Sequence, residues 1–357
     1  MNIRDFVKDS LSKFAQRVPS NPPSEHVYFV CRAHNMVDDS GTGRISTEGG
    51  KLFVKTFNPA TCECGEKKYT IPSNGVVEVD IPYGVTYQAH TELSGYGASC
   101  RVINRACNDK RYVHLWNLPL GVYSIAYNFI YGNYGDNGAY RCMPLLSESD
   151  DFSGSSEWDI GNGDIYDYEG KEAEDDYAED MDFCAILVST AKSSFALYNG
   201  NIKADTTLKW SEQNYGRSVP GLPEYYTINN NDWDKAIAAA EKDLDGALNT
   251  EKILDAMYDA PAAQFAAKAP YYVVQNYLPS AGELKLIYNN KSAINSLAST
   301  LGYSWTIDND WYWSSCVYDV SYSFYCLMDN GDINGYGYKN YDFYVLRVSA
   351  FTMSSSY

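Results

Sequence analysis

Histidine is scarce in this sequence and is confined to one part of the chain. The four histidines among 357 residues are His26, His34, His90 and His114. The rest of the chain lacks an imidazole, which excludes Ser-His-Asp and Cys-His catalysis built within it. A Walker-type phosphate loop ending in Gly-Lys-Ser/Thr is also missing. The sequence therefore predicts a protein that is not an enzyme and needs no cofactor.

Long apolar runs are missing as well. No stretch reaches the ~18 apolar residues of a membrane span, so no membrane insertion is expected. The first residues, MNIRDFVKDSLSKFAQRVPSNPP, mix acidic and basic side chains. They contain no compact apolar segment followed by a small-residue cleavage site, unlike a secretory signal. We therefore expect synthesis in a cytoplasm.

The nine cysteines form no recognisable framework. Their odd number leaves no closed set of disulfides, and we expect most of them to be small buried hydrophobic residues. Cys62 and Cys64 have no second ligand pair at a zinc-site spacing. No metal site is therefore expected.

Positive charge is scarce relative to negative charge. The formal net charge of −18 repels phosphate backbones and anionic membrane surfaces, which excludes nucleic acid as a partner. Residues 146–182 hold 15 acidic residues against Lys171 alone, and this composition predicts an acidic linker. Asp159, Asp164 and Asp167 have the chemistry of calcium ligands, but their spacing matches no EF-hand loop. A solvated linker is the favoured interpretation.

The regions before the linker show two different periodicities. Within residues 1–23, the apolar spacing predicts an amphipathic attachment or oligomerisation helix that could pack on its own body, on another protomer or on another protein. Residues 24–145 contain short β-rich runs separated by Gly, Asn, Pro and Ser clusters, which predicts a β-sandwich. Residues 115–127, LWNLPLGVYSIAY, resemble a turn and strand of bacterial immunoglobulin-like or prealbumin-like modules. Such a module would be a spacer.

Residues 183–357 predict an α+β domain. The runs CAILVST and SSFALYNG indicate paired strands, and helices are expected at residues 232–239, 251–258 and within 281–301. Ser280 and Glu283 have the spacing of a capping box at the start of the last helix. Strands follow from Trp311.

The stretch from Trp311 to Arg347 has the composition of a binding loop. Of the 29 residues from Cys316 to Tyr344, 23 are Tyr, Asp, Asn, Gly, Ser, Phe or Cys, a mixture that offers stiff aromatic contacts and adaptable hydrogen bonds. The alternative is a Tyr-rich β-meander with Gly and Asn turns. At the ends, Trp313 is expected to fill a core, and Arg347 to pair with an acidic or carbonyl group.

Five motifs occur in order through this domain: Asp245-Gly246 with Asn249-Thr250, Pro261-Ala262-Ala263, the YLPSAGEL of residues 277–284, Tyr312-Trp313-Ser314-Ser315, and the YVLRV of residues 344–348. Together they resemble the C-type-lectin-like domains of bacteria and phages that serve as variable proteins of diversity-generating retroelements. These domains are relatives in fold of the formylglycine-generating enzymes. The resemblance covers residues 183–357 and implies a ligand-binding head.

In that family, mutagenesis at adenines varies the segment between the Trp-Ser-Ser motif and the Arg-containing strand, turning AAC codons into other codons that end in C. The resemblance thus implies a variable segment at residues 316–344, in which only Met328 and Lys339 fall outside the residue types that such codons encode. Cysteines act in the formylglycine relatives, but Cys316 and Cys326 lie inside this segment, where Cys is one accessible outcome.

Ligand contacts are expected from exposed side chains in the variable segment. Strand alternation will turn about half of any continuous run inward. The candidates are Tyr318, Asp319, Tyr322, Phe324, Tyr325, Asp332, Asn334, Tyr336, Tyr338, Asn340, Tyr341 and Asp342.

The sequence therefore favours a receptor-binding (tropism) protein of a phage tail, located in the virion after synthesis in the host cytoplasm. The expected partners are a host-cell surface protein or glycan, virion attachment proteins and further copies of the chain, for example in a trimer. Two alternatives stay open. One is a cellular display protein diversified in the same way, in the cytoplasm or on a bacterial surface. The other is a carbohydrate-binding module or enzyme with a fixed Tyr-lined site.

Overall fold

The computed structural model covers most of the two predicted folded units. The predicted N-terminal helix lies outside the described residues, and so does the acidic linker apart from its last two positions, together with the three calcium candidates Asp159, Asp164 and Asp167. The described residues are 23–35, 44–132, 139–145, 181–198, 202–204, 206–212, 217–268, 274–351 and 353–356.

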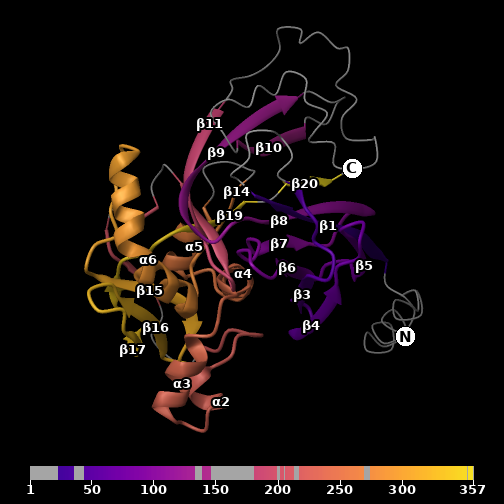
Figure 1. Cartoon of the computed structure of the whole chain (residues 1–357). Helices are drawn as coiled ribbons and strands as arrows, with labels where there is room; N and C mark the ends of the chain where they lie inside the picture. The colour runs from indigo at the N-terminus through magenta and orange to yellow at the C-terminus, as the bar shows by residue number, and fades with distance from the viewer. Residues whose placement is uncertain are drawn as a thin grey trace, which may run out of the picture.

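The first unit is a β-sandwich, as the strand pattern predicted (Figure 1). One sheet has the order β2-β1-β8-β20 with β5 also paired to β1, and the other has the order β4-β3-β6-β7. The strands are β1 (Ser24–His34), β2 (Arg44–Ile45), β3 (Lys51–Asn58), β4 (Glu63–Thr70), β5 (Val76–Pro82), β6 (Thr86–Glu92), β7 (Val102–Arg105), β8 (Lys110–Asn117) and β20 (Met353–Ser356).

Alternating side chains explain why these strands form a sandwich. In β5 the buried residues Val77, Val79 and Ile81 alternate with exposed or half-buried ones, so one face of the strand meets the core. From the two sheets, the fully buried rings of Phe29 and Tyr87 meet edge to face with their centroids 6.0 Å apart. The core therefore lies between the sheets.

A six-stranded sheet joins the two predicted units, with the order β10-β9-β11-β12-β19-β14. Its strands are β9 (Gly121–Gly132), β10 (Ala139–Leu145), β11 (Met181–Ser189), β12 (Ser194–Tyr198), β14 (Val274–Tyr277) and β19 (Val348–Phe351). The predicted boundaries of the first unit, residues 24–145, include β9 and β10. Strand β9 pairs with β11 from Gly121 opposite Ser189 to Phe129 opposite Met181, so backbone hydrogen bonds continue from one unit into the other.

The second unit contains five helices among its described residues: α2 (Tyr225–Ile228), α3 (Trp233–Ala240), α4 (Gly246–Ala256), α5 (Pro261–Ala267) and α6 (Ala281–Thr300). The capping box at the start of α6 is confirmed, because Ser280 Oγ accepts from Glu283 N and the Glu283 carboxylate accepts from Ser280 N. Helix α3 begins one residue after the predicted start, and α4 begins five residues before it. Helix α5 was not predicted as a helix.

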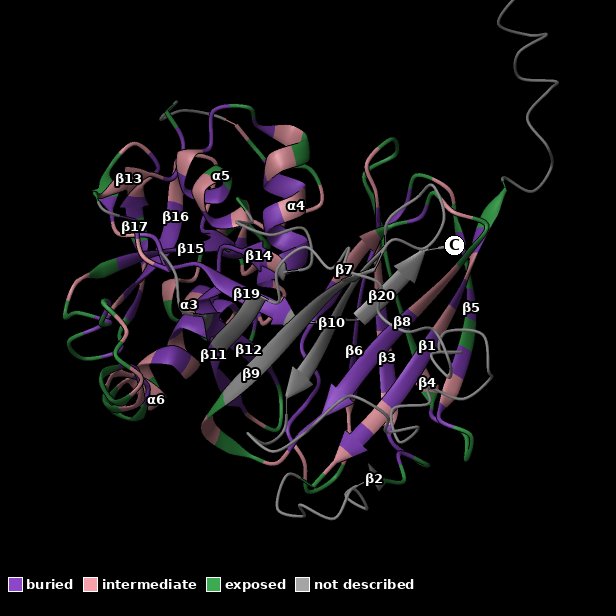
Figure 2. Ribbon diagram, turned by 90° about the horizontal axis from the view of Figure 1, so that it is seen from above, coloured by how far each residue is buried: buried purple, intermediate pink, exposed green. Residues whose placement is uncertain are grey.

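Two smaller sheets complete the second unit. Strands β15 (Trp311–Val317), β16 (Tyr322–Leu327) and β17 (Ile333–Tyr338) form an antiparallel three-stranded sheet in that order. Strand β13 (Leu208–Lys209) pairs with β18 (Asp342–Phe343). Figures 1 and 2 place β17 at the opposite side of the molecule from β5 of the sandwich.

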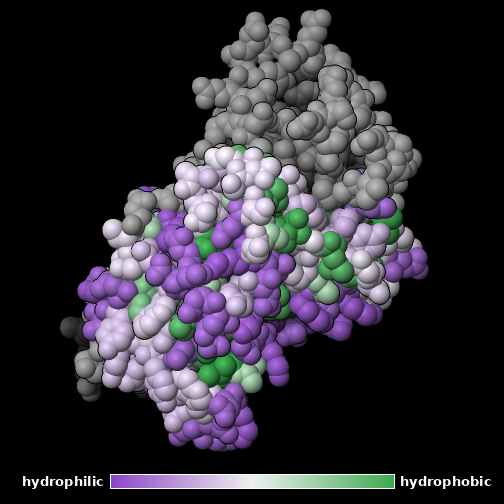
Figure 3. Space-filling view, turned by 60° about the vertical axis from the view of Figure 1, so that its left-hand side comes forward, coloured by the Kyte–Doolittle hydropathy of each residue, from purple (hydrophilic) through white to green (hydrophobic). Residues whose placement is uncertain are grey.

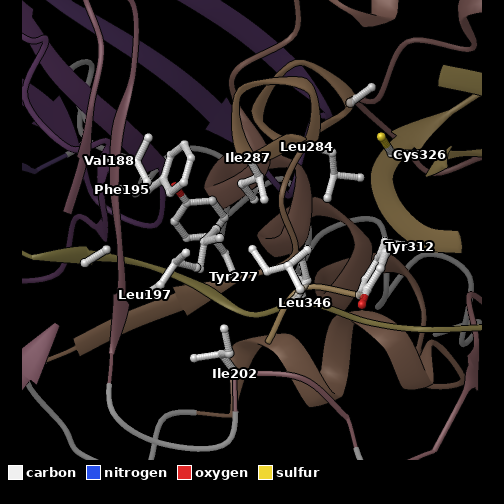
Figure 4. Packing of buried hydrophobic residues seen from close by; sticks show 14 of the residues in the cluster. Val188, Phe195, Leu197, Ile202, Tyr277, Leu284, Ile287, Tyr312, Cys326 and Leu346 are labelled. Carbon is white, nitrogen blue, oxygen red and sulfur yellow. The ribbon is translucent and has the colours of Figure 1, made fainter. Parts of the chain in front are cut away.

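One hydrophobic core extends from the six-stranded sheet to α6 and the three-stranded sheet. Figure 4 shows Leu284 and Ile287 of α6 between Val188 and Phe195 on one side and Tyr312 on the other. All five side chains are almost completely removed from solvent. Burial of this apolar area is the main force that holds the three-stranded sheet in place.

Both predicted end anchors are confirmed as core residues. The Trp313 ring is fully buried and its Nε1 donates to Leu208 O over 2.8 Å. Arg347 is buried, stacks its guanidinium on Phe265 at 4.4 Å from the ring centroid, and donates from a terminal nitrogen to Phe265 O over 2.7 Å. A carbonyl partner for a buried charge is what the sequence required.

Candidate binding surface

Strand β17 carries the clearest alternation in the variable segment. Ile333, Gly335 and Gly337 are buried, whereas the residues between and after them, Asn334, Tyr336 and Tyr338, are half-buried or exposed. A strand turns successive side chains to opposite faces. The less buried side chains of β17 are two tyrosines and an asparagine, and the register shift in β17 places Asn334 opposite Tyr325 and Tyr338 opposite Tyr322.

The two glycines of β17 let large rings pack directly against the strand. A Cβ at Gly335 would lie 2.3 Å from Cδ2 of Tyr318, and one at Gly337 would lie 2.6 Å from Cζ3 of Trp313. Real Cβ atoms do not approach other atoms so closely. The glycines are therefore required by the core under the surface, and they are not interchangeable loop residues.

The outward tyrosines belong to a continuous line of ring contacts, which we call the aromatic row: Trp233, Tyr336, Tyr322, Tyr338 and Tyr341. Successive ring centroids are 4.1, 5.9, 4.4 and 5.1 Å apart. Tyr336 is 55% exposed and Tyr341 48%, and the other three are half-buried. Rings in mutual contact lose little rotamer entropy on binding, so the row is a preorganised contact surface.

Trp233 is the member that the sequence analysis missed. It is the first residue of α3, after Asp232, whose carboxylate caps the helix by accepting from Lys235 N. The indole stacks on Tyr336 with an interplanar angle of 14°. Only the packing of α3 against β17, about 100 residues later in the chain, brings the two rings together, and no local pattern signals it.

The structure divides the twelve predicted contact residues into three groups. Asp332, Tyr336, Tyr341 and Asp342 are exposed, and Asp319, Tyr322, Asn334, Tyr338 and Asn340 are half-buried. Tyr318, Phe324 and Tyr325 are buried. The prediction of exposed contacts is wrong for these last three.

The three buried aromatics support the surface from below. Tyr318 is 1% exposed and stacks on Tyr226 at 4.7 Å, with Phe324 edge-on at 5.5 Å. Tyr325 packs on the other side of the sheet, against the Trp311 ring at 5.4 Å and the Trp313 ring at 6.3 Å. These rings fill volume that no smaller residue would fill, which is a core role.

Lys339 fixes the loop beside the aromatic row. Its side chain is 1% exposed, and Nζ donates to Asp319 O at 3.0 Å and Val320 O at 3.2 Å. Burial of the ammonium group lowers the pKa of Lys339 to about 8. The Asp319 carboxylate also serves this loop, because its Oδ1 accepts from the backbone N–H groups of Ser321 and Tyr322.

Burial opposes activation of the cysteines in the variable segment. Cys316 is buried, accepts from Ala281 N, and donates to Asp243 Oδ2 over 3.3 Å. Burial raises the pKa of Cys316 well above its ordinary value, and burial also raises that of Cys326 to about 12. A nucleophilic cysteine needs the opposite shift.

The described ranges lack metal-site and membrane-span features. They contain no group of three or more His, Cys, Asp or Glu residues placed to hold a metal ion. None of their helices combines the length and the apolar character needed to cross a bilayer. In Figure 3, pale and purple atoms dominate the side of the second unit, and strongly hydrophobic atoms form small separate areas.

Comparison with known proteins gives only distant likenesses. No family model and no curated protein matches the sequence. A fimbrial protein from Bacteroides ovatus is similar with 12% identity and a TM-score of 0.36, covering 92% of this chain and 71% of that one. The shaft pilin SpaA from Lactobacillus rhamnosus GG is similar with 12% identity and a TM-score of 0.22, covering 36% of this chain and 77% of that one. TM-scores this low support no argument about function.

Proposed function

We propose that this chain is a non-enzymatic receptor-binding protein, and that its second unit is a C-type-lectin-like head which presents the aromatic row to its ligand. The observation that carries the proposal is the construction of β17, in which the exposed Tyr336 and half-buried Tyr338 alternate with glycines that admit the Tyr318 and Trp313 rings. Large aromatic residues on a rigid support are the usual energetic centre of a protein interface.

The division between inward and outward residues supports diversification of the surface. Met328 and Lys339, the two residues of the segment outside the set that altered AAC codons encode, are 0% and 1% exposed. Both therefore belong to the support. The exposed residues of the aromatic row in this segment, Tyr336 and Tyr341, belong to the accessible set. A surface built in this way can change its contacts while its core stays constant.

A phage tail is the setting that we propose for this head. Several copies on one virion would convert weak individual contacts into strong attachment through effective concentration. A head with a changed surface could then sample a new receptor without high intrinsic affinity. In this proposal the sandwich unit is a spacer between the head and the virion.

Sequencing the gene from many isolates tests the diversification. We expect substitutions to concentrate at Asn334, Tyr336, Tyr338 and Tyr341, with Gly335 and Gly337 constant, and a near-identical template repeat with adenine-biased differences nearby. Equal variability at residues 316–344 and 183–300, without such a repeat, would show a fixed site instead. Neighbouring tail genes would separate the phage protein from a cellular display protein.

Attachment to host cells tests the surface itself. The full chain, immobilised in many copies, should retain host cells, and the double variant Tyr336→Ala/Tyr338→Ala should lose most of that retention because it removes the centre of the aromatic row. Tyr258→Ala is the matched control, since Tyr258 is 77% exposed and lies outside the row. Equal retention by all three proteins would contradict the proposal.

A further inference from the structure

We infer that the ligand of the aromatic row is a positively charged polypeptide segment that brings Arg or Lys side chains onto these rings. The inference deepens the proposed function and rests on it. It is carried by the acidic side chains near the row and by the hydrogen bonds that polar side chains there already form within the protein.

Within the variable segment, the exposed charge has one sign. The segment 316–344 contains Asp319, Asp329, Asp332 and Asp342 and a single base, Lys339. The four carboxylates are exposed or half-buried, whereas the Lys339 ammonium is buried and donates to two backbone carbonyls. A sequence count gives 1 − 4 = −3 for the segment, and its four acids stay accessible whereas its base is buried. From α6, Lys285 and Lys291 donate to the carbonyl groups of Gly331 and Met328, at the turn that holds Asp329 and Asp332.

Two lysines near the row, Lys235 and Lys209, already form ion pairs with carboxylates of the protein. Lys235, two residues after Trp233, lies 2.9 Å from the Asp232 carboxylate. Lys209, on the strand paired with β18, lies 2.7 Å from the Glu212 carboxylate. Asp234, between Trp233 and Lys235, is exposed. The environment of the aromatic row is therefore acidic on the α3 side as well as on the strand side.

Aromatic faces and carboxylates together fit a guanidinium or ammonium group. A cation is attracted to the face of a Trp or Tyr ring, most strongly for Trp. The planar guanidinium of Arg also stacks on rings while its edge forms two parallel hydrogen bonds to a carboxylate. The row offers both partners, since Tyr341 of the row is followed directly by the exposed Asp342.

A neutral sugar fits this surface less well. Sugars need directional hydrogen-bond partners, and several candidates here are engaged within the protein. Asn334 Oδ1 accepts from Tyr336 N over 2.9 Å, and Asp332 Oδ2 accepts from Asn330 Nδ2 over 2.7 Å. Asp319 Oδ1 accepts from two backbone N–H groups. The carboxylates of Asp332 and Asp319 still attract a cation, because a carboxylate keeps its charge and free lone pairs when it accepts such bonds.

The charge of the whole chain favours the same partner. A net charge of −18 attracts a basic segment over long range and speeds its association, and it repels acidic proteins and anionic glycans. This steering acts before contact. Specificity for the row itself must come from the local rings and carboxylates.

Fluorescence anisotropy with two labelled peptides tests the inference on the full chain. One is an extended peptide of alternating Arg and Gly, and the other replaces each Arg by citrulline, which has a similar shape and no charge. We expect the Arg peptide to bind and the citrulline peptide to bind at least about tenfold more weakly, as expected for loss of charged contacts at an interface. Tyr336→Ala should weaken the Arg peptide about tenfold at any salt concentration, since it removes a central aromatic contact.

Matched charge variants separate the local site from the overall field. Asp332→Asn/Asp342→Asn should weaken the Arg peptide about two- to fivefold at low salt and have little effect at high salt. Glu48→Gln/Glu63→Gln changes the net charge equally at exposed sandwich positions and should have a smaller effect. The inference is overturned if both pairs act equally, or if citrulline peptide binds as well as Arg peptide.

A neutral oligosaccharide array on the same proteins distinguishes this inference from the proposed function. Binding of a neutral glycan that is lost in Tyr336→Ala, without binding of the Arg peptide, would leave the proposed function standing and refute the cationic ligand. If Tyr336→Ala/Tyr338→Ala alters neither peptide binding, glycan binding nor host-cell retention, both proposals fail.

Discussion

Strands β4 and β17 both lie at the end of a sheet, yet their exposed side chains differ in kind. Among the described residues, strand β4 pairs with β3 alone, and its exposed residues include Glu63, Glu66, Lys67 and Lys68. Within the same described ranges, strand β17 pairs with β16 alone, and its less buried residues are the exposed Tyr336 and the half-buried Asn334 and Tyr338. Most residues of β4 are exposed on both faces of the strand. Strand β17, in contrast, has large rings packed against its glycines.

The difference separates an edge that is protected from one that is available for contact. Charged side chains of both signs discourage pairing of an exposed strand with other chains. Tyrosines held by neighbouring rings do the reverse, because they present apolar area at little entropic cost. The lack of charge on β17 is therefore informative only because β4 shows that this protein does use charge on an exposed edge.

The largest effect should come from removing the support under β17. Tyr318→Ala should lower the free energy of unfolding by about 3–5 kcal/mol, because it empties a fully buried ring site. Tyr69→Ala on the half-buried position of β4 should cost about 1 kcal/mol, as most substitutions do. Urea unfolding followed by fluorescence measures both. Equal losses would mean that Tyr318 is not a core residue.

Lys339, which follows β17, should make the free energy of unfolding depend on pH. Burial lowers its pKa from 10.5 to about 8, so between these values this group binds more protons in the unfolded chain than in the folded one, and its contribution to stability rises with pH. Lys339→Met should remove a contribution that rises by about 3 kcal/mol across that window, seen as the difference between the two pH profiles. Lys67→Met, at an exposed position of β4, is the control for the loss of one ammonium group. A profile for Lys339→Met that parallels the unmodified protein would show that the ammonium is solvated.

Replacing one glycine by alanine in β17 and one in β4 tests whether packed rings require the glycine of β17. Gly335→Ala should destabilise the protein by about 1–3 kcal/mol, because its Cβ would overlap the fixed ring of Tyr318. Gly65→Ala on β4 meets only Thr56 Oγ1 at 2.7 Å, and this hydroxyl can rotate away, so its effect should be much smaller. Thermal unfolding of the two variants gives the comparison. The interpretation of β17 fails if Gly65→Ala is the more harmful change.

The smallest effect on stability should come from the outward residues of β17. Tyr336→Ala removes a ring that is already 55% exposed, and we expect a loss within about 1 kcal/mol despite its stacking on Trp233. This tolerance is what a diversified surface requires. Chemical denaturation measures it, and a loss as large as that of Tyr318→Ala would place Tyr336 in the core instead.

Local signals predicted the parts of the fold that depend on neighbours in sequence. The capping box of Ser280 and Glu283 lies within one turn, and the buried anchors Trp313 and Arg347 follow from the cost of exposing an indole or burying an unpaired charge. The sandwich strands followed from alternation. Helix α5 was missed because seven residues give too short a periodicity.

The members of the candidate surface could not be predicted in the same way. Register shifts interrupt the pairing between Trp313 and Val317 in β15 and between Ser323 and Tyr325 in β16. Each shift changes which residues face inward beyond it, so simple alternation from the anchors assigns the wrong side to part of the segment. Both faces of this sheet are also covered: Tyr318 and Phe324 pack in the cluster that contains α6, and Tyr325 packs in the cluster that contains Trp313, which is why these three candidates are buried.

By itself the sequence determined the composition of the binding segment, its two anchors and its excess of acidic residues, because these are properties of residue types and their order. Only the tertiary structure decided that Lys339 points inward and that Trp233 joins Tyr336 in one row. Burial and contact between distant segments depend on how the sheets and α3 pack, and no local pattern in one sequence records that packing.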